Sequence, residues 1–219
     1  MNSNFTRAEI KAQAKEQLRG KVWMFFLVSV IVFVIVLPFS FLTEMEGIAP
    51  IIGLIGTYVI APPLSLGMTM VYLDVTYGDP VEISTLFKGF QMLGKSIALF
   101  LWIILFTFLW SCLFIIPGII KSYSYSMAFY ILAENPDMTA REAITESKII
   151  MNGHKLDFFV LQLSFFFWAL LVIVTFGIAA IYVSPYEQLT YTNFYHNIKR
   201  QPAAVVNEVY EEPVAEVIE

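Results

Sequence analysis

Two charged side chains interrupt apolar stretches of this sequence and are the first candidates for chemistry. Lys121 comes four residues after the start of a Pro-Gly pair, Pro117 and Gly118, and Glu187 comes two residues after Pro185. An ionisable group at membrane depth is costly, so it is usually paired or serves an ion or proton path. If both prolines mark turns at the same depth, the ammonium and the carboxylate form an ion pair. Otherwise the lysine stem carries its ammonium to water at the membrane rim.

Residues that perform catalysis or hold metals are otherwise scarce. The single cysteine, Cys112, lies in an apolar run, and the two histidines, His154 and His196, fall at expected helix ends, where they can interact with terminal carbonyl groups. One cysteine makes no intrachain disulfide, and there is no Cys/His ligand cluster. Zinc-protease, nucleophile-elbow, phosphate-loop and dinucleotide motifs are absent from the sequence. We therefore expect a protein that is not an enzyme and that binds no cofactor, metal or nucleic acid.

The composition of the chain indicates a membrane protein. Of its 219 residues, 58% are hydrophobic and only 14% are charged, and the mean hydropathy is +0.71. A soluble domain of this size has too little interior for so many apolar side chains. Three stretches without a charged residue reach the roughly 20 residues that a spanning helix needs, at 22–42, 96–116 and 158–183. We expect helices, because isolated strands would leave backbone groups unsatisfied in lipid.

The positions of Lys and Arg decide how many crossings we expect. A four-span arrangement, with residues 48–73 as the fourth span, would put four basic residues outside the cell, namely Lys121, Arg141, Lys148 and Lys155. Cytoplasmic loops should instead hold the excess of positive charge. Two further, shorter spans at 119–133 and 186–199 place twelve of the thirteen Lys and Arg in the cytoplasm and leave only Lys121 near the outer face. We predict a six-span helical bundle in the cell membrane with both termini cytoplasmic.

These six spans are predicted to form three hairpins, each made of one long helix and one short helix that starts at a proline. A Leu/Met-x-Gly-Lys/His pattern precedes each long span, at Gly20, Gly94 and Gly153. Glycine ends helices because it accepts positive φ, and proline suits a first helical turn because it has no N–H to leave unsatisfied. The chain then consists of three similar units, each opening with a cytoplasmic amphipathic helix, unless this punctuation recurs by chance.

Three regions follow from this organisation. They are an N-terminal cytoplasmic amphipathic helix at 1–21, a six-span membrane domain at 22–200 and an acidic tail at 201–219. The tail has five Glu and no base, so we expect it to be disordered. Thr-x-x-Glu at Thr6 and at Thr139 has the spacing of a capping box and predicts a helix start at each. A protein partner would bind the cytoplasmic helices or the tail, although we expect the apolar stripe of 139–152 to pack on its own bundle.

Several local patterns are similar to those of one family. They are Ile116-Pro117-Gly118-Ile119-Ile120-Lys121, Tyr130-Ile131-Leu132-Ala133-Glu134-Asn135-Pro136, Met151-x-Gly153-His154-Lys155 and Pro185-Tyr186. Over roughly residues 5–200 the chain resembles the bacterial integral membrane proteins catalogued as domain of unknown function 975. The resemblance implies a multi-pass protein of a bacterial cell membrane and brings no established activity. It adds Glu134, Asn135, Gly153, His154 and Tyr186 to the residues that we expect to matter for structure or function.

Two functions are compatible with these features. The first is a non-enzymatic protein of the bacterial cell envelope, a scaffold or regulator that works through its cytoplasmic helices and tail. The alternative is a small-solute transporter built from three two-helix repeats, since repeats and proline-interrupted helices are typical of transporters. A transporter normally has a charged or polar site near the bilayer midplane, whereas the long spans here carry no charge. We therefore favour the first function, with the lipid bilayer as a partner in either case.

Overall fold

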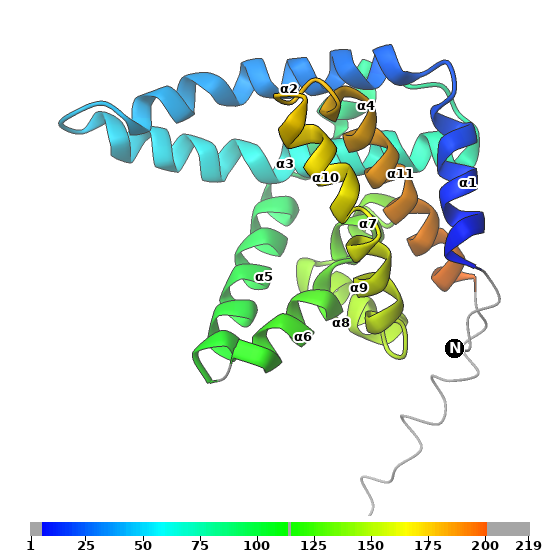
Figure 1. Ribbon diagram of the computed structural model, residues 1–219. Helices are drawn as coiled ribbons and strands as arrows, with labels where there is room; N and C mark the ends of the chain where they lie inside the picture. The colour runs from blue at the N-terminus through cyan, green and yellow to red at the C-terminus, as the bar shows by residue number, and fades with distance from the viewer. Residues whose placement is uncertain (1–5, 114, 201–219) are drawn as a thin grey trace, which may run out of the picture.

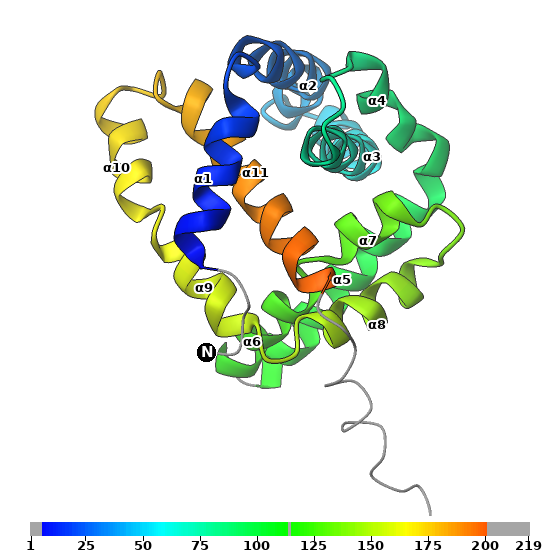
Figure 2. The same ribbon diagram turned by 90° about the vertical axis from the view of Figure 1, so that its right-hand side faces the viewer.

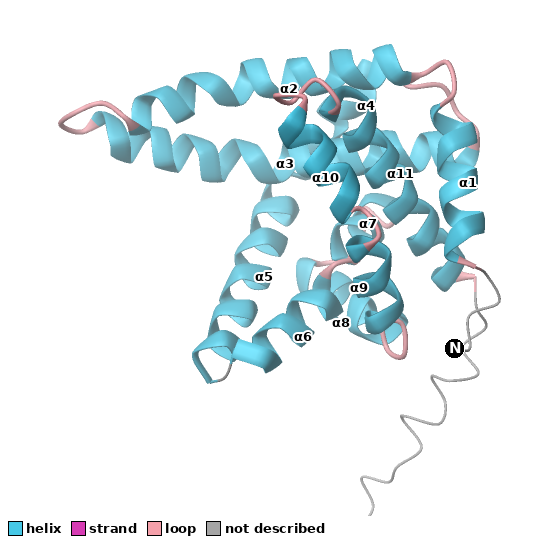
Figure 3. Cartoon of the chain, viewed as in Figure 1, coloured by secondary structure: helices cyan, strands magenta, loops and turns pink. Residues whose placement is uncertain are grey.

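The chain is helical throughout the part that the structure describes. The computed structural model describes residues 6–113 and 115–200, which form helices joined by short turns, with no strand among them (Figure 3). In chain order the helices are α1 (Arg7–Leu18), α2 (Val22–Thr43), α3 (Ala49–Tyr77), α4 (Ile83–Lys88), the 3-10 helix η1 (Gly89–Met92), α5 (Leu93–Leu113), α6 (Ile115–Tyr125), α7 (Ala128–Glu134), α8 (Ala140–Ile150), α9 (Lys155–Leu163), α10 (Phe166–Val174) and α11 (Ala180–Lys199). The predicted all-α class is confirmed. The predicted tail at 201–219 lies outside the described residues.

The ends of α1 and α8 follow directly from their sequences. Both helices begin with a capping box, built by Thr6 in α1 and by Thr139 in α8, in which the hydroxyl and a glutamate three residues on satisfy each other's backbone N–H groups. Gly20 and Gly153 follow these helices at φ +77° and +81°, the left-handed region that ends a helix. Gly94 instead lies inside α5. The predicted glycine stop is thus confirmed at two of its three positions.

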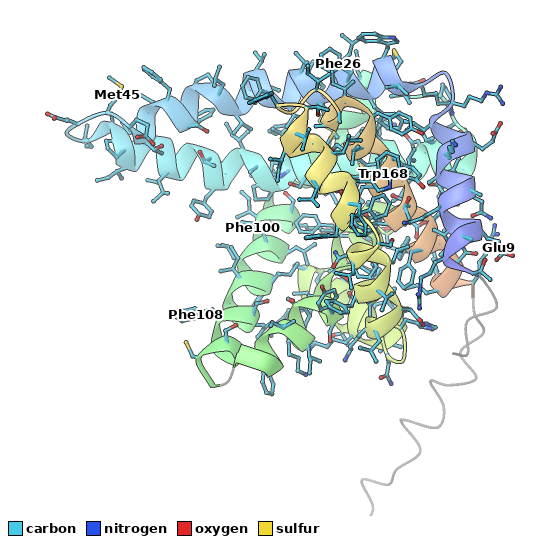
Figure 4. All side chains as sticks on the ribbon, in the orientation of Figure 1. Glu9, Phe26, Met45, Phe100, Phe108 and Trp168 are labelled. Carbon is cyan, nitrogen blue, oxygen red and sulfur yellow. The ribbon has the colours of Figure 1, made fainter. Side chains whose placement is uncertain are left out.

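Four segments of the described chain are long and apolar enough to cross a bilayer. They are Val22–Thr43, Ala49–Tyr77, Ile83–Cys112 and Lys155–Val174. Their apolar side chains largely point outward, as Phe108 does from α5 (Figure 4). Trp23 is 71% exposed and Phe167 is 77% exposed. Exposed apolar surface on this scale requires a cover of lipid or protein. The two short spans predicted at 119–133 and 186–199 are not among the four.

Each short helix was predicted to start at a proline, namely Pro62, Pro117 or Pro185, but two of these three lie well inside longer helices. Pro62 is buried within α3, which continues unbroken for 29 residues, and Pro185 is buried within α11. Pro117 falls in the first turn of α6, so the chain reverses before it. Proline is tolerated in such helices because neighbouring helices pack around the backbone groups that it leaves free. The predicted short helix at 119–133 is also interrupted, at Ser126 and Met127, between α6 and α7.

The third reversal of the chain lies earlier than the sequence predicted. Residues 158–183 do not form one helix, because the chain breaks at Ser164 and Phe165 and turns at residues 175–179. Gly177 in this turn has φ +89°, and the Thr175 hydroxyl accepts a hydrogen bond from the backbone N–H of Ala179 at 3.0 Å. These two features let the chain reverse without proline. The predicted pairing of one long with one short, proline-started helix is therefore wrong in detail.

Three helical hairpins pack on one another, and the last one is linked back to the first part of the chain through α1. Within them α2 contacts α3, α5 contacts α6 and α10 contacts α11. Helix α7, which follows α6 after the turn at Ser126 and Met127, ends the second hairpin. The α2–α3 hairpin projects furthest from the body (Figure 1). The short helix before each hairpin packs on the last helix of another hairpin: α4 on α3, α8 on α7 and α1 on α11. Figure 2 shows α1 packed across α11. Because α1 packs on α11, the start of α1 and the end of α11 lie on the same side of the molecule (Figure 1).

Helix α3 and the α4–η1 segment approach so closely that only glycine fits between them. A Cβ atom on Gly67 would lie 1.9 Å from the carbonyl oxygen of Leu86, and one on Gly89 would lie 2.0 Å from that of Pro63. Glycine at a helix crossing allows two backbones to touch in this way. The crossing fixes α4 against α3 and thereby sets where the second hairpin begins.

Candidate functional site

The last helices of the three hairpins meet at one carboxylate, that of Glu134. It lies at the C-terminal end of α7 and accepts hydrogen bonds from the Tyr77 hydroxyl of α3, the Tyr195 hydroxyl of α11 and the Lys199 ammonium of α11. The Tyr195 bond measures 2.5 Å. The Glu134 side chain is 11% exposed, whereas that of Lys199 is 45% exposed. Segments that are 57 to 65 residues apart in sequence are thus joined through two carboxylate oxygens.

The surroundings of Glu134 favour its ionised form. Burial alone would raise the pKa of this carboxyl, but the hydrogen bonds from Lys199, Tyr195 and Tyr77 and the nearby ammonium charge outweigh that effect, so its pKa lies below the ordinary value. Hydrogen bonds to an ionised acceptor are about twice as strong as neutral ones. The carboxylate therefore acts as an anchor for three donors.

A small open cleft borders this cluster. It has a volume of about 380 Å³ and is lined by Met70, Leu73, Asp74, Tyr77, Ala133, Glu134 and Lys199. The Asp74 carboxylate accepts a hydrogen bond from the Thr85 hydroxyl at 3.1 Å, which ties α3 to α4. The Tyr77 ring packs edge-on against His196, with ring centroids 5.3 Å apart. Among the described residues no three His, Cys, Asp or Glu side chains are grouped to hold a metal ion.

Further polar contacts attach α1 to the rest of the fold. Gln17 and Asn193 exchange reciprocal amide hydrogen bonds of 3.1 and 2.8 Å, which join α1 to α11. Near the start of α1, the Arg7 guanidinium lies 3.8 Å from the Asp157 carboxylate of α9, and the His154 imidazole lies 3.8 Å from the same group. His154 is thus placed at the N-terminal end of α9 beside a carboxylate.

The structure does not bring the two charges singled out from the sequence together. The Lys121 ammonium lies 4.7 Å from the centroid of the Trp110 ring, a cation–π contact across the second hairpin. The Glu187 carboxylate instead accepts a hydrogen bond from the Tyr191 hydroxyl, one turn further along α11. The proposed Lys121–Glu187 ion pair is therefore wrong.

The remaining residues from the family resemblance lie at helix ends or in close contacts between helices. Gly118 faces Ser111 so closely that a Cβ atom would lie 2.2 Å from the serine hydroxyl oxygen. The Asn135 amide donates to the carbonyl of Ile131 at 2.9 Å and satisfies the end of α7. The Tyr186 ring packs edge-on against Phe165, with centroids 5.3 Å apart. These positions support helix ends and close helix contacts.

The partners of Glu134 were missed by the sequence reasoning. Tyr77, Tyr195 and Lys199 gave no motif, because they come from two helices far away in the sequence. One signal was present: the predicted topology put the ends of the spans 48–73, 119–133 and 186–199 on the same side of the membrane, and residues 77, 134 and 199 lie at or just after these ends. A carboxylate and an ammonium at such ends are expected to find each other once the helices pack.

The residues of this cluster lie within the part of the chain that matches a known family. The family described as protein of unknown function (DUF975) matches residues 1–124 and 113–202, which together include every residue of the Glu134 cluster. The chain belongs to this family. Its resemblance over residues 5–200 is thereby confirmed. Among curated proteins and among solved structures, none matches the chain.

Proposed function

We propose that this DUF975 family member is an integral membrane protein of a bacterial cell envelope that acts without catalysis, as a scaffold or regulator. The observation that carries the proposal is how its polar groups are used. Glu134, its partners and the Gln17–Asn193 pair satisfy one another and hold helices together. The apolar side chains, such as Trp23 and Phe167, face outward as a membrane-embedded surface requires.

We further propose that all three hairpins enter the membrane from the cytoplasm and that both termini stay there. Contact of α1 with α11 supports a common side for the two ends of the described chain. Exposed Lys15 and Arg19 on α1 fit the excess of positive charge expected on that side. The outermost turn of the first hairpin, in contrast, carries Glu44 and Glu46 and no base.

A partner protein is proposed to meet α8. The apolar stripe of this helix, including Ala143 and Ile144, is buried in the fold, so a partner would contact its charged face instead. That face borders a shallow hollow of about 620 Å³ lined by Asp137, Met138, Arg141, Glu142, Thr145 and Glu146. Mixed charges at a rim favour specificity and fast association.

The cleft beside Glu134 is the one observation that favours the transporter alternative, because Asp74 lines it. Complementation of a deletion strain under envelope stress separates the two functions. As a scaffold, the protein should lose complementation when the hollow beside α8 is changed by Asp137→Lys with Thr145→Arg, and should keep it with Asp74→Asn. The opposite pattern, with both variants present in the membrane at wild-type levels, would favour transport through the cleft.

A further inference from the structure

The turn of the third hairpin carries no charged side chain and exposes large apolar ones. Between Asp157 and Glu187 the chain carries no charged residue. At the turn the Val174 side chain is 74% exposed, that of Phe176 97% and that of Ile178 72%. The turn of the first hairpin, where Met45 lies at the outermost end (Figure 4), has two glutamates instead. A turn in the outer aqueous space would not expose so much apolar surface without a polar neighbour.

The backbone of this turn is also suited to hydrocarbon. The N–H groups of residues 175 to 180 all have acceptors inside the turn or the helix before it, the shortest bond being 2.8 Å from Gly177 to the Val172 carbonyl. Phe176 supports this compact turn by adopting φ +51°, which is unusual for a residue other than glycine. Backbone donors at membrane depth must be satisfied internally, because no water is present there.

Lys11 of α1 marks where the membrane–water interface meets the first half of the third hairpin, formed by α9 and α10. Its ammonium lies 3.4 Å from the Ser164 carbonyl oxygen and 4.3 Å from the centroid of the Phe165 ring, at the break between α9 and α10. Helix α1 also exposes Lys15 and Arg19, so it lies in water or at the membrane surface. Only α10, with nine residues, extends from that level to the turn. Nine helical residues rise about 14 Å, half of a roughly 30 Å hydrocarbon core.

The second leg gives the same depth. The Tyr186 ring lies 5.3 Å from that of Phe165, which places the two legs at one level there. Glu187, the first charge after the turn, follows directly. From Ala180 to Glu187 the helix rises about 11 Å. Trp168 of α10 and Tyr182 of α11 pair between this level and the turn, with ring centroids 6.4 Å apart (Figure 4 shows Trp168 on α10). Counted from the level of Lys11, both legs are thus too short to cross, although Lys155–Val174 counted as a whole reaches the length of a span.

We propose that residues 165–186 form a re-entrant hairpin that dips into the cytoplasmic leaflet and returns without crossing. Its partner is the acyl chains of that leaflet, which surround Val174, Phe176 and Ile178 near the bilayer centre. This hairpin replaces two of the six crossings predicted from the sequence and keeps both termini in the cytoplasm. The proposal rests on the proposed membrane embedding of the first hairpin.

The test measures depth with nitroxide labels on single cysteines. In a Cys112→Ser background, Phe176→Cys and, separately, Met45→Cys are labelled and reconstituted into vesicles of phosphatidylethanolamine and phosphatidylglycerol. Collision rates with oxygen, which partitions into hydrocarbon, and with a water-soluble nickel chelate are compared. Ile178→Cys is the second variant of the turn, in case the strained position 176 does not tolerate cysteine.

The re-entrant hairpin predicts that the labels at 176 and 178 collide with oxygen at least several times more often than with nickel. The label at 45 should show the reverse. Nickel access at 176 and 178 from the face opposite the termini would mean a full crossing and overturn the proposal. Access from the face of the termini would mean that the hairpin is not inserted, and also overturn it. If the label at 45 is reached from the face of the termini, the proposed membrane embedding fails as well.

Discussion

Replacing Glu134 by glutamine should destabilise the whole fold, because one carboxylate joins three hairpins. Glutamine keeps the shape and one acceptor oxygen but loses the charge and turns one acceptor into a donor. Hydrogen bonds to a charged group contribute about 1.5–3 kcal/mol each, compared with about 1 kcal/mol for neutral ones. Lys199 is 45% exposed and can return to water, so its loss is small. Weakening the hydrogen bonds from Tyr77 and Tyr195 should therefore lower the free energy of unfolding by about 2–3 kcal/mol.

The assay is thermal unfolding in detergent, followed by intrinsic fluorescence. For a chain of this size the expected cost corresponds to a fall in Tm of roughly 5–10 °C. Glu44→Gln is the matched control, because this glutamate is exposed in the turn of the first hairpin, and it should leave Tm unchanged. Tyr195→Phe should cost about 1–2 kcal/mol in the native background and much less beside Glu134→Gln, since the two residues share one bond. Equal costs in both backgrounds would refute the reasoning.

The same site predicts how stability depends on pH. The folded pKa of Glu134 lies below its ordinary value of 4.5, so the carboxylate stabilises the fold fully above that value. This contribution is lost as pH falls from 4.5 through the folded pKa, because the unfolded chain then binds the proton more readily. Glu134→Gln removes the titrating group and should flatten the acid side of the stability profile. An unchanged acid slope in the variant would assign that slope to other carboxyl groups.

Two further pairs of variants test the helix contacts. Gly67→Ala should lower the free energy of unfolding by at least about 2 kcal/mol, because the new Cβ atom would meet the Leu86 carbonyl. Gly94→Ala, with open space around it, should raise that free energy by about 0.5–1 kcal/mol. Denaturation in detergent measures both changes, and equal effects would contradict the close crossing. Gln17→Ala and Asn193→Ala should each weaken the docking of α1, and the double variant should cost less than their sum; additive losses would show that the two amides act independently.

Local features of this fold could be predicted from the sequence. The capping boxes at Thr6 and Thr139 and the glycine stops at Gly20 and Gly153 depend only on neighbouring residues, and all four are present. The apolar runs likewise indicated long outward-facing helices. Glu134 was reached through the family pattern, which marked the position without giving its partners.

Features that depend on packing could not be predicted in this way. Pro62 and Pro185 resemble turn signals locally, yet both are buried inside continuous helices, where packing outweighs the local preference. The actual third turn depends on Gly177 within an apolar run that otherwise has the pattern of a helix. The pairing of Lys121 with Trp110 rather than Glu187 follows from which helices are neighbours. Sequence spacing alone does not contain that information.

The most direct test of the central claim is the side of the membrane on which each exposed turn lies. Single cysteines replace Met45, Ser84 and Asp137 in a Cys112→Ser background, and intact cells are treated with a maleimide that cannot cross membranes. All three side chains are exposed in the structure, so each is open to the reagent on its own side. The account predicts labelling at 45 in intact cells and at 84 and 137 only after permeabilisation. Labelling of 84 or 137 in intact cells, or protection of 45, would contradict a protein whose hairpins all enter from the cytoplasm.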